Sequence, residues 1–394
     1  MSRTPMDSET LLARLVAFDT TSRNSNLALI DFVADYLDGF GAVVEVLHDA
    51  EGRKANLLAS IGPGREGGVV LSGHTDVVPV DGQAWHSEPF RLAVHDEVLV
   101  GRGSSDMKGF MACALAAVPD MAAAKLRSPL HFAFSYDEEV GCLGAPHMIH
   151  HMLEQHFAPR AVLIGEPTDM RVMNAHKGMQ TRRVEICGHE AHSSQTQQGV
   201  SAVGLAGRLV HWLVTAAEAR RLHGLRDERF TPAWSSLAVN EIQGGTAVNI
   251  LAGHCSFTWE LRHLPEDDPA ALLADFRRFC AQVEAEARDI SPRVSVRETL
   301  LAEIPALVPE AGGAAEALAR LLTDGDEPPG AVAFCTEGGQ FQQAGYSAVV
   351  CGPGSVAQAH QPDEHVSRED LARCDRMLAQ LVGHQGQAPD QRPT

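Results

Sequence analysis

The sequence predicts an α/β protein in which a helix-covered mixed sheet is interrupted by a smaller α+β domain. The chain has 394 residues, and a prior of roughly 150 residues per domain predicts two or three domains. Apolar, β-branched runs alternate with helical patterns at both ends of the chain, as in a sheet covered by helices. Between residues 180 and 296 the pattern changes to two β-α-β halves. We therefore expect one domain inserted within another.

The first segment, residues 1–179, alternates between helix-like and strand-like patterns. Apolar residues recur at helical spacing in the segments 9–18, 27–37 and 107–124. Short runs rich in Val, Ile and Leu are typical of strands and occur at 43–47, 56–61, 69–72, 130–136 and 161–164. These strands and helices are expected to form the first part of the larger domain.

The second segment, residues 180–296, has strand patterns at 181–187, 235–242 and 254–262 and helix patterns at 200–221 and 269–287. Such halves make a small α+β sandwich that resembles a ferredoxin-like domain. After residue 297 the alternation returns, with helices expected at 312–322 and 368–381 and a strand at 348–351. Residues 297–394 are thus expected to complete the first domain, and the tail after Gly383 is expected to be disordered.

The composition is that of a globular protein outside the membrane, with 44% hydrophobic and 21% charged residues. No run approaches the roughly 18 apolar residues of a membrane span, and a signal peptide is not expected, so we predict a cytoplasmic location. The net charge of −19 would repel nucleic acids and anionic membranes, and neither is an expected partner. Eight cysteines without a Cys-x-x-Cys pair predict buried, reduced thiols.

Five short motifs containing acids and histidines follow the apolar runs or lie in Gly-rich turns. They are SGHTD (72–76), GRGSSDMKG (101–109), DEE (137–139), GEPT (165–168) and AHQPDE (359–364). The strand ends of an α/β sheet gather ligands at one edge. Two histidines and three carboxylates there would suit a pair of divalent ions, zinc first, with one carboxylate and a water molecule bridging them.

Each motif also has a purely structural interpretation. The alternatives are a strand-closing histidine for His74, a helix N-cap for Asp106, a solvated acidic turn for Glu138 and Glu139, a polar strand end for Glu166, and a surface-loop histidine for His360. Five such coincidences in one chain are improbable, so the sequence favours a metal site.

Two carboxylates are expected to work beside the ions. Asp76, two residues after His74, can accept a hydrogen bond from the imidazole and fix its tautomer. Adjacent residues point in different directions, so one member of the pair Glu138 and Glu139 can bind metal while the other acts as general base.

Two other signals do not predict a site. The segment 62–67 matches G-x-G-x-x-G but precedes a strand, so we expect a hairpin-type turn there. His189 and His192 are three residues apart, whereas an H-E-x-x-H zinc motif needs four.

The motifs resemble those of the zinc-dependent aminoacylase and carboxypeptidase superfamily. Further segments, at 188–194, 244–250, 335–337 and 351–364, resemble its acetylornithine deacetylase branch. The resemblance extends from about residue 10 to residue 380. It implies a catalytic domain with an inserted lid domain, through which two copies of the chain form a homodimer.

The resemblance also implies roles for individual residues. One divalent ion, zinc or cobalt, would be held by His74, Asp106 and Glu166, and a second by Asp106, Glu139 and His360, with Asp106 bridging. Glu138 would be the general base and Asp76 the partner of His74. His192 would reach the active site of the neighbouring subunit, and Asn249 and Arg262 would bind the substrate carboxylate.

The implied substrate is a small N-acyl amino acid, foremost N2-acetyl-L-ornithine. N-acetyl-citrulline, N-acetyl-diaminobutyrate, N-succinyl-diaminopimelate and a small dipeptide are the alternatives. The segment 338–340 (GGQ) replaces a more apolar run, so the acyl amino acid stays open, and Glu337 is a candidate for the substrate's side-chain ammonium group. A binding or scaffold protein without catalysis is disfavoured, because every acid and histidine of the motifs is present.

Overall fold

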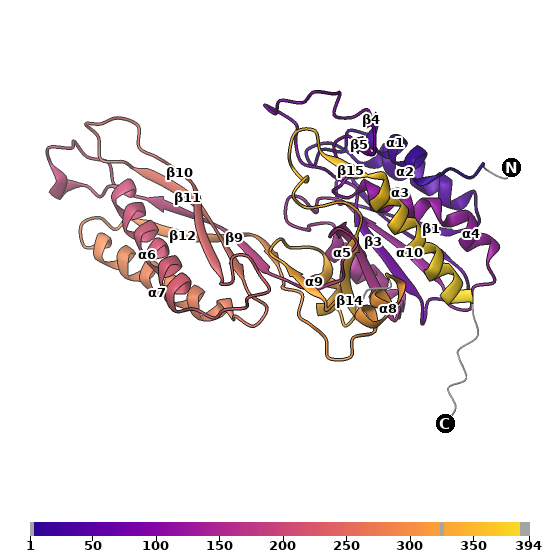
Figure 1. Ribbon diagram of the computed structural model, residues 1–394. Coiled ribbons are helices and arrows are strands. Elements are labelled where there is room, and N and C mark those ends of the chain that lie inside the picture. The colour runs from indigo at the N-terminus through magenta and orange to yellow at the C-terminus, as the bar shows by residue number, and fades with distance from the viewer. Residues whose placement is uncertain (1–3, 324–326, 387–394) are drawn as a thin grey trace. The chain divides into compact units, whose positions relative to one another are not determined.

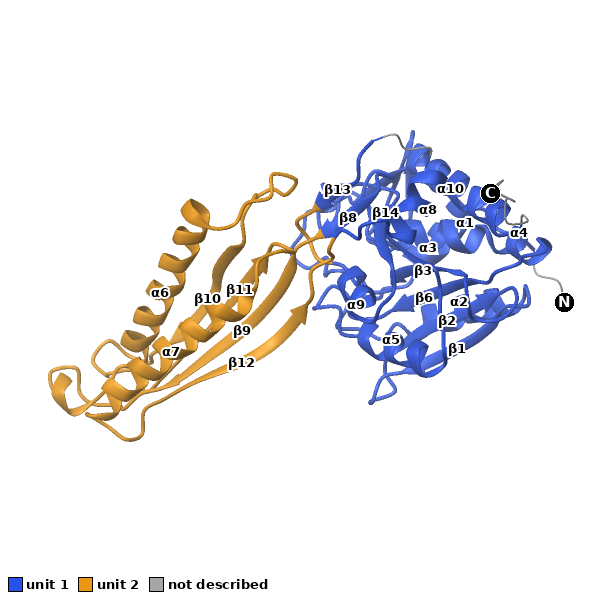
Figure 2. Ribbon diagram, turned by 90° about the horizontal axis from the view of Figure 1, so that it is seen from below, with its two compact units in different colours: residues 1–175, 309–331, 336–394 blue, residues 176–308, 332–335 orange. Residues whose placement is uncertain are grey.

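The computed structural model describes residues 4–323 and 327–386. The chain forms two compact units, which are blue and orange in Figure 2. Unit 1 comprises residues 1–175, 309–331 and 336–394, and unit 2 comprises residues 176–308 and 332–335. The segment that the sequence marks as an insertion, 180–296, lies within unit 2.

Unit 1 is built around a mixed sheet that has eight strands among the described residues, in the order β1-β2-β6-β3-β7-β14-β8-β13. The strands are β1 (Val43–His48), β2 (Ala55–Ile61), β3 (Val69–His74), β6 (Leu130–Ser135), β7 (Ala161–Pro167), β8 (Met173–His176), β13 (Gly330–Val332) and β14 (Ala348–Gly352). The central strands β6, β3, β7 and β14 run parallel. They are buried at every position, which explains their continuous apolar sequences.

Helices cover this sheet, as Figure 1 shows. They are α1 (Ser8–Val16), α2 (Leu27–Asp38), α3 (Lys108–Ala116), α4 (Val118–Ala123), α5 (Ala145–Glu154), α8 (Ala314–Leu322), α9 (Gly338–Gln343) and α10 (Arg368–Gly386). Helix α3 is buried along almost its whole length and contacts α1, α10 and the strands β3 and β7. Gly165 of β7 permits this packing, because a Cβ atom there would lie 1.9 Å from the Phe110 ring.

Three sequence predictions need correction in unit 1. The helix expected at 107–124 is two helices, because Pro119 lacks an N–H group and its ring clashes with the preceding turn. The segment 62–67 is not a hairpin turn, since β6 lies between the two strands that it connects. Helix α10 continues to Gly386, beyond the expected start of disorder, and the rest of that tail lies outside the described residues.

A small three-stranded sheet in the described part of unit 1 brings two of the motif loops together. Its strands are β4 (Ala93–His95), β5 (Val98–Val100) and β15 (His365–Ser367), in the order β15-β5-β4. Strands β5 and β15 are antiparallel, with His365 opposite Val100. The first residues of the loop after β5 therefore lie beside the last residues of the loop before β15.

Unit 2 confirms the ferredoxin-like prediction. Its elements follow one another as β9 (Gly178–Cys187), the short helix η1 (Thr196–Gln198), α6 (Ala202–His223), β10 (Ser236–Gly244), β11 (His254–His263), α7 (Pro269–Arg288) and β12 (Ser295–Ile304). The sheet order is β10-β11-β9-β12 with antiparallel neighbours. Alternate residues of β9 and β11 pack against α6 and α7, and Trp259 meets Phe276 edge to face at 5.3 Å.

Two predictions from composition can be compared with the structure. All eight cysteines lie in the described ranges and none of them forms a disulfide bond; most are buried, but Cys187 is exposed and Cys335 partly so. Within the described residues, no helix is both long and apolar enough to cross a membrane.

Candidate metal centre

The predicted metal ligands lie where adjacent parallel strands end. His74 is the last residue of β3, Glu139 follows β6, Glu166 lies near the end of β7, and His360 belongs to the loop after β14. The carboxyl ends of parallel strands meet at one edge of a sheet, and this is where α/β proteins bind ligands. Asp106 reaches the same edge from the loop between β5 and α3.

Asp106 lies between the two histidines and offers one oxygen to each. Its Oδ1 is 3.0 Å from His74 Nε2, and its Oδ2 is 3.2 Å from His360 Nε2. Glu166 Oε1 lies 3.7 Å from the same nitrogen of His74, and Glu139 Oε2 lies 3.0 Å from that of His360. The five side chains therefore form two groups that share Asp106, and the N-cap interpretation of Asp106 fails because Met107 takes that position.

These separations fit divalent ions. Ligands bound to zinc at about 2.0–2.1 Å in a tetrahedron lie about 3.3 Å apart, close to the four distances between side-chain atoms. Two sets of three ligand atoms each lie within 4.8 Å of one another, namely His74 with Asp106 and Glu139, and His74 with Glu138 and Glu166. The donor set thus fits a pair of ions, and Glu138 also lies within ligand range.

The electrostatics of the cluster favour added positive charge. Burial raises the pKa of Glu138 to about 8 and that of Glu139 to about 7, and neighbouring carboxylates add to both shifts. Burial likewise raises the pKa of Glu166 well above its usual value. Hydrogen bonds to Asp106 and Glu139 raise the pKa of His360 to about 10. Protons thus relieve the crowding of negative charge, and divalent cations would relieve it more strongly.

The imidazole of His74 is oriented by the main chain. Its Nδ1 donates to the backbone carbonyl of Asp76 at 2.9 Å, while the Asp76 carboxylate lies 3.7 Å away. The sequence pointed to the carboxylate as the hydrogen-bond acceptor. The consequence for the tautomer is the same, because a carbonyl only accepts, so Nδ1 carries the proton and Nε2 keeps its lone pair for an ion.

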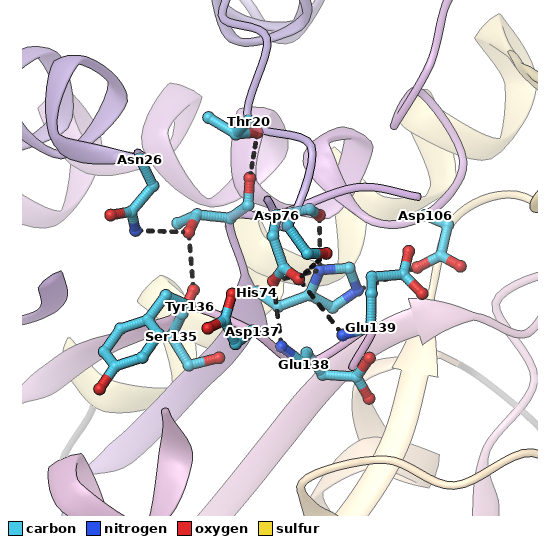
Figure 3. A network of polar contacts seen from close by, with 12 residues as sticks. Thr20, Asn26, His74, Asp76, Asp106, Ser135, Tyr136, Asp137, Glu138 and Glu139 are labelled. Atoms are coloured by element: carbon cyan, nitrogen blue, oxygen red, sulfur yellow. Dashed lines mark hydrogen bonds and ion pairs between the residues drawn. The ribbon is translucent and has the colours of Figure 1, made fainter. Parts of the chain in front are cut away.

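The carboxylate of Asp76 instead holds the acid doublet (Figure 3). Its Oδ1 accepts from the backbone N–H of Glu138 at 3.1 Å, and its Oδ2 accepts from that of Glu139 at 3.3 Å. Ser22 Oγ donates to Oδ2 at 2.7 Å. Asp76 therefore fixes the turn from which both acids point into the site.

The ends of β3 and β6 are tied together beside His74 and the acid doublet (Figure 3). Thr75 Oγ1 donates to the carbonyl of Ser135 at 2.7 Å and accepts from Asn26 Nδ2 at 2.8 Å. Thr20 Oγ1 donates to the carbonyl of Thr75 at 2.6 Å. This network fixes His74 relative to the acid doublet.

Sequence reasoning missed several residues that contact the site. Cys142 Sγ lies 3.3 Å from Glu138 Oε1 as a donor, and Ser22 binds Asp76. Glu364 binds the backbone of Asp106. Only Glu364 carried a signal, as the last acid of the motif 359–364, whereas nothing in the sequence distinguishes Ser22 or Cys142.

The substrate-binding candidates of unit 2 do not form one group. His192 and Asn249 are exposed neighbours: Ser193 donates its N–H to the carbonyl of Asn249, and His192 bridges to Ile250. Asn249 precedes β11, whose first residue is His254. Arg262 lies near the opposite end of this strand, eight residues after His254, which corresponds to about 27 Å at the usual rise per residue. It is paired with Glu260, with Nε 2.6 Å from Oε1.

Glu337 lies in a different environment from the one expected of a residue that binds the substrate's ammonium group. It is 2% exposed, and its two carboxylate oxygens accept hydrogen bonds from the hydroxyls of Ser72 and Ser135. Burial raises its pKa to about 7. These contacts favour a role in tying the 336–343 segment to β3 and β6, so we assign it no ammonium-binding role.

Comparison with known proteins identifies the family. Residues 70–384 match the model of peptidase family M20/M25/M40. The chain is 37% identical to an acetylornithine deacetylase of Myxococcus xanthus over 95% of this chain and 96% of the relative. It is 33% identical to one of Pasteurella multocida over 91% of each chain.

Solved structures share the fold. An M20 family metallo-carboxypeptidase of Sulfolobus solfataricus superposes with a TM-score of 0.75 at 14% identity, covering 97% of this chain and all of the other. A dinuclear metal-binding peptidase of Bacillus subtilis superposes with a TM-score of 0.63 at 15% identity, covering 95% and 97%. The predicted superfamily is therefore confirmed, and the chain belongs to peptidase family M20/M25/M40.

Proposed function

We propose that the protein is a metal-dependent amidohydrolase that converts N2-acetyl-L-ornithine to L-ornithine and acetate. The observation that carries this proposal is the pair of ligand groups that share Asp106 beside a further acid, Glu138. The substrate is proposed from curated relatives named acetylornithine deacetylase, which are 31–37% identical over nearly the whole chain. A cytoplasmic location stays a prediction.

The proposed cofactor is a pair of divalent ions, zinc first and cobalt as the alternative. His74, Asp106 and Glu166 would hold one, and Asp106, Glu139 and His360 the other, in agreement with the side-chain distances above. When bound, such ions polarise the amide carbonyl and lower the pKa of a water molecule to about 7.

Glu138 would act as the general base. The carboxylate of Asp76 holds the backbone N–H of Glu138. The Glu138 side chain is not among the ligands proposed for the two ions, so its carboxylate can take a proton from the attacking water. The same carboxyl group would then deliver the proton to the departing amine nitrogen. His192, contributed by a neighbouring subunit, would donate to the developing oxyanion.

The separation of Asn249 from Arg262 supports a shared active site. The part of β11 that separates them is far longer than a small acylated amino acid molecule. If both bind one substrate, they must come from two copies of the chain. We therefore propose a homodimer in which His192 and Asn249 of one subunit serve the site to which its partner contributes Arg262.

The surface of unit 2 offers apolar residues for such a dimer. Strand β10 is an edge strand, and Ile242 on it is 53% exposed. Val214 on α6, which packs on β10, is 56% exposed. Light scattering of the purified protein should therefore give the mass of a dimer, and the mass of a monomer would contradict the shared site.

A substrate panel on the zinc-loaded and cobalt-loaded protein tests the function. The panel contains N2-acetyl-L-ornithine, N-acetyl-L-citrulline, N-acetyl-diaminobutyrate, N-succinyl-diaminopimelate and small dipeptides, with chelator-treated protein as the control. The highest kcat/KM is expected for N2-acetyl-L-ornithine. A higher value for another member would replace the substrate but keep the reaction class, whereas metal binding without hydrolysis of any member would favour the scaffold hypothesis.

A further inference from the structure

The carboxylate of Glu364 is enclosed by the loop that carries Asp106. Oε1 accepts from the backbone N–H of Ser105 at 2.9 Å and of Asp106 at 3.0 Å. Oε2 accepts from the N–H of Gly103 at 3.0 Å and from Arg102 Nη1 at 2.7 Å. The side chains of Glu364 and Arg102 are each 1% exposed. A buried carboxylate thus fills a concave backbone segment that resembles an anion-binding nest.

The main chain of Glu364 reinforces this contact. Its carbonyl accepts from the N–H of Gly101 at 2.8 Å and from Ser104 Oγ at 3.2 Å. These bonds continue the pairing of β5 with β15, in which His365 lies opposite Val100. The loop that carries Asp106 is therefore joined to Glu364 through both the main chain and the side chain of this residue.

Arg102 extends the connection to the backbone of His360. Its Nη2 donates to Gln83 Oε1 at 2.5 Å, and its guanidinium lies 5.0 Å over the Trp85 ring. Gln83 Nε2 in turn donates to the carbonyl of His360 at 2.9 Å. A continuous set of contacts therefore leads from the backbone of Asp106, through Glu364, to the backbone of His360.

We propose that Glu364 is a positioning residue for the metal centre. It holds the backbones of Asp106 and His360 so that their side chains face each other at 3.2 Å. The inference rests on the proposed metal centre and adds to it a group that binds no ion itself. Outer partners of this kind orient ligands, and their loss typically weakens metal affinity about 10–100-fold.

The contacts require a carboxylate in particular. All four hydrogen-bond partners of its oxygens are donors, so the group must accept at both ends. A glutamine has the same size, but its amide nitrogen would face two donors whichever way it is turned. Glu364→Gln therefore disturbs the loop of Asp106 without creating a cavity.

A buried ion pair that serves only the fold is the competing explanation. It predicts that Glu364→Gln lowers thermal stability because the Arg102 charge is left unpaired, with no specific effect on ions. The double variant Arg102→Met with Glu364→Gln removes this unpaired charge. It should recover thermal stability without recovering metal affinity if Glu364 acts on the metal centre.

The test uses the metal-free full chain, with zinc affinity measured by competition against a chromophoric chelator and the site geometry read from the cobalt absorption spectrum. Glu364→Gln, and the double variant, should bind zinc about 10–100-fold more weakly and give an altered cobalt spectrum. The matched control is Asp363→Asn, the neighbouring acid, which contacts His86 at the surface. It should stay within twofold of the wild type.

Each outcome decides between the explanations. A folded Glu364→Gln variant with wild-type zinc affinity and cobalt spectrum would overturn the inference. So would recovery of wild-type affinity in the double variant, or loss of folding in both variants, because each would show that the carboxylate serves only the fold. A wild-type protein that binds no zinc or cobalt would refute the proposed metal centre instead.

Discussion

The candidate metal centre of unit 1 and the substrate-binding candidates of unit 2 are built in opposite ways. In unit 1, His74, Glu166 and Asp106 are buried at strand ends or in a loop held by many backbone hydrogen bonds. In unit 2, His192 and Asn249 are exposed at one end of the sheet, and Arg262 lies at the other end. The first set lies together within a single chain, whereas we propose that the second set forms a site only when another copy of the chain contributes to it.

The contrast separates two tasks of a hydrolase. Ligands for divalent ions must keep distances within a few tenths of an ångström, and parallel strand ends supply that rigidity. Substrate contacts must open and close, and exposed groups on a separate unit can do so. Substitutions in each unit test whether the two regions divide the work in this way.

The largest effect is expected for Glu138→Gln in unit 1. The amide cannot take a proton from water, so kcat should fall about 10²–10⁴-fold, the usual contribution of a general base. Metal content, measured by atomic emission, should stay near two ions per chain, whereas Glu139→Gln should lose metal. If Glu138→Gln also loses metal, Glu138 is a ligand and the base must be sought elsewhere.

His192→Ala in unit 2 should lower kcat by roughly 10²–10³-fold, as loss of one oxyanion donor does. Mixed dimers of His192→Ala with Glu138→Gln should regain activity, because one of their two sites then has both residues. The control is His189→Ala, which bonds to Ser291 and should cost about threefold at most. Mixed dimers as inactive as their parents would show that each chain supplies its own His192.

Arg262→Lys should raise KM about tenfold and leave kcat nearly unchanged. The lysine keeps the charge but loses the planar fork that binds a carboxylate through two hydrogen bonds. Steady-state kinetics of Arg183→Lys, an exposed position on the neighbouring strand β9, provide the control. An unchanged KM for Arg262→Lys would remove Arg262 from the substrate site.

The smallest effect is expected for Glu337→Gln. Because the carboxyl group is buried and bonded to Ser72 and Ser135, KM for N2-acetyl-L-ornithine should change less than about threefold. Thermal unfolding followed by circular dichroism should show a lower Tm. A large rise in KM at unchanged Tm would restore the ammonium-binding hypothesis.

The five proposed metal ligands could be selected from the sequence because each follows an apolar strand or lies in a glycine-rich loop. Parallel strands place such positions at one edge without further information. The same reasoning could not predict the contacts of Glu337 or Glu364. Glu364 is 258 positions from Asp106, and no local pattern shows which loops meet after folding.

The remaining differences from prediction arise where a neighbouring backbone group or a proline overrides the sequence pattern. The apolar pattern at 107–124 continues past Pro119, but the proline interrupts the backbone hydrogen bonds and divides the helix. The spacing of two residues predicts that the Asp76 carboxylate accepts a hydrogen bond from His74. The backbone carbonyl of Asp76 satisfies the imidazole, and this leaves the carboxylate to bind the acid doublet.

The shared position of Asp106 makes the two proposed ions thermodynamically linked. Since Oδ1 faces His74 and Oδ2 faces His360, the first ion to bind restricts the rotation of a carboxylate that the second ion needs. Cooperativity of this kind is reciprocal: each ion alters the affinity for the other by the same factor. A titration of the metal-free protein should therefore deviate from two independent sites, and removal of either ion should loosen the other.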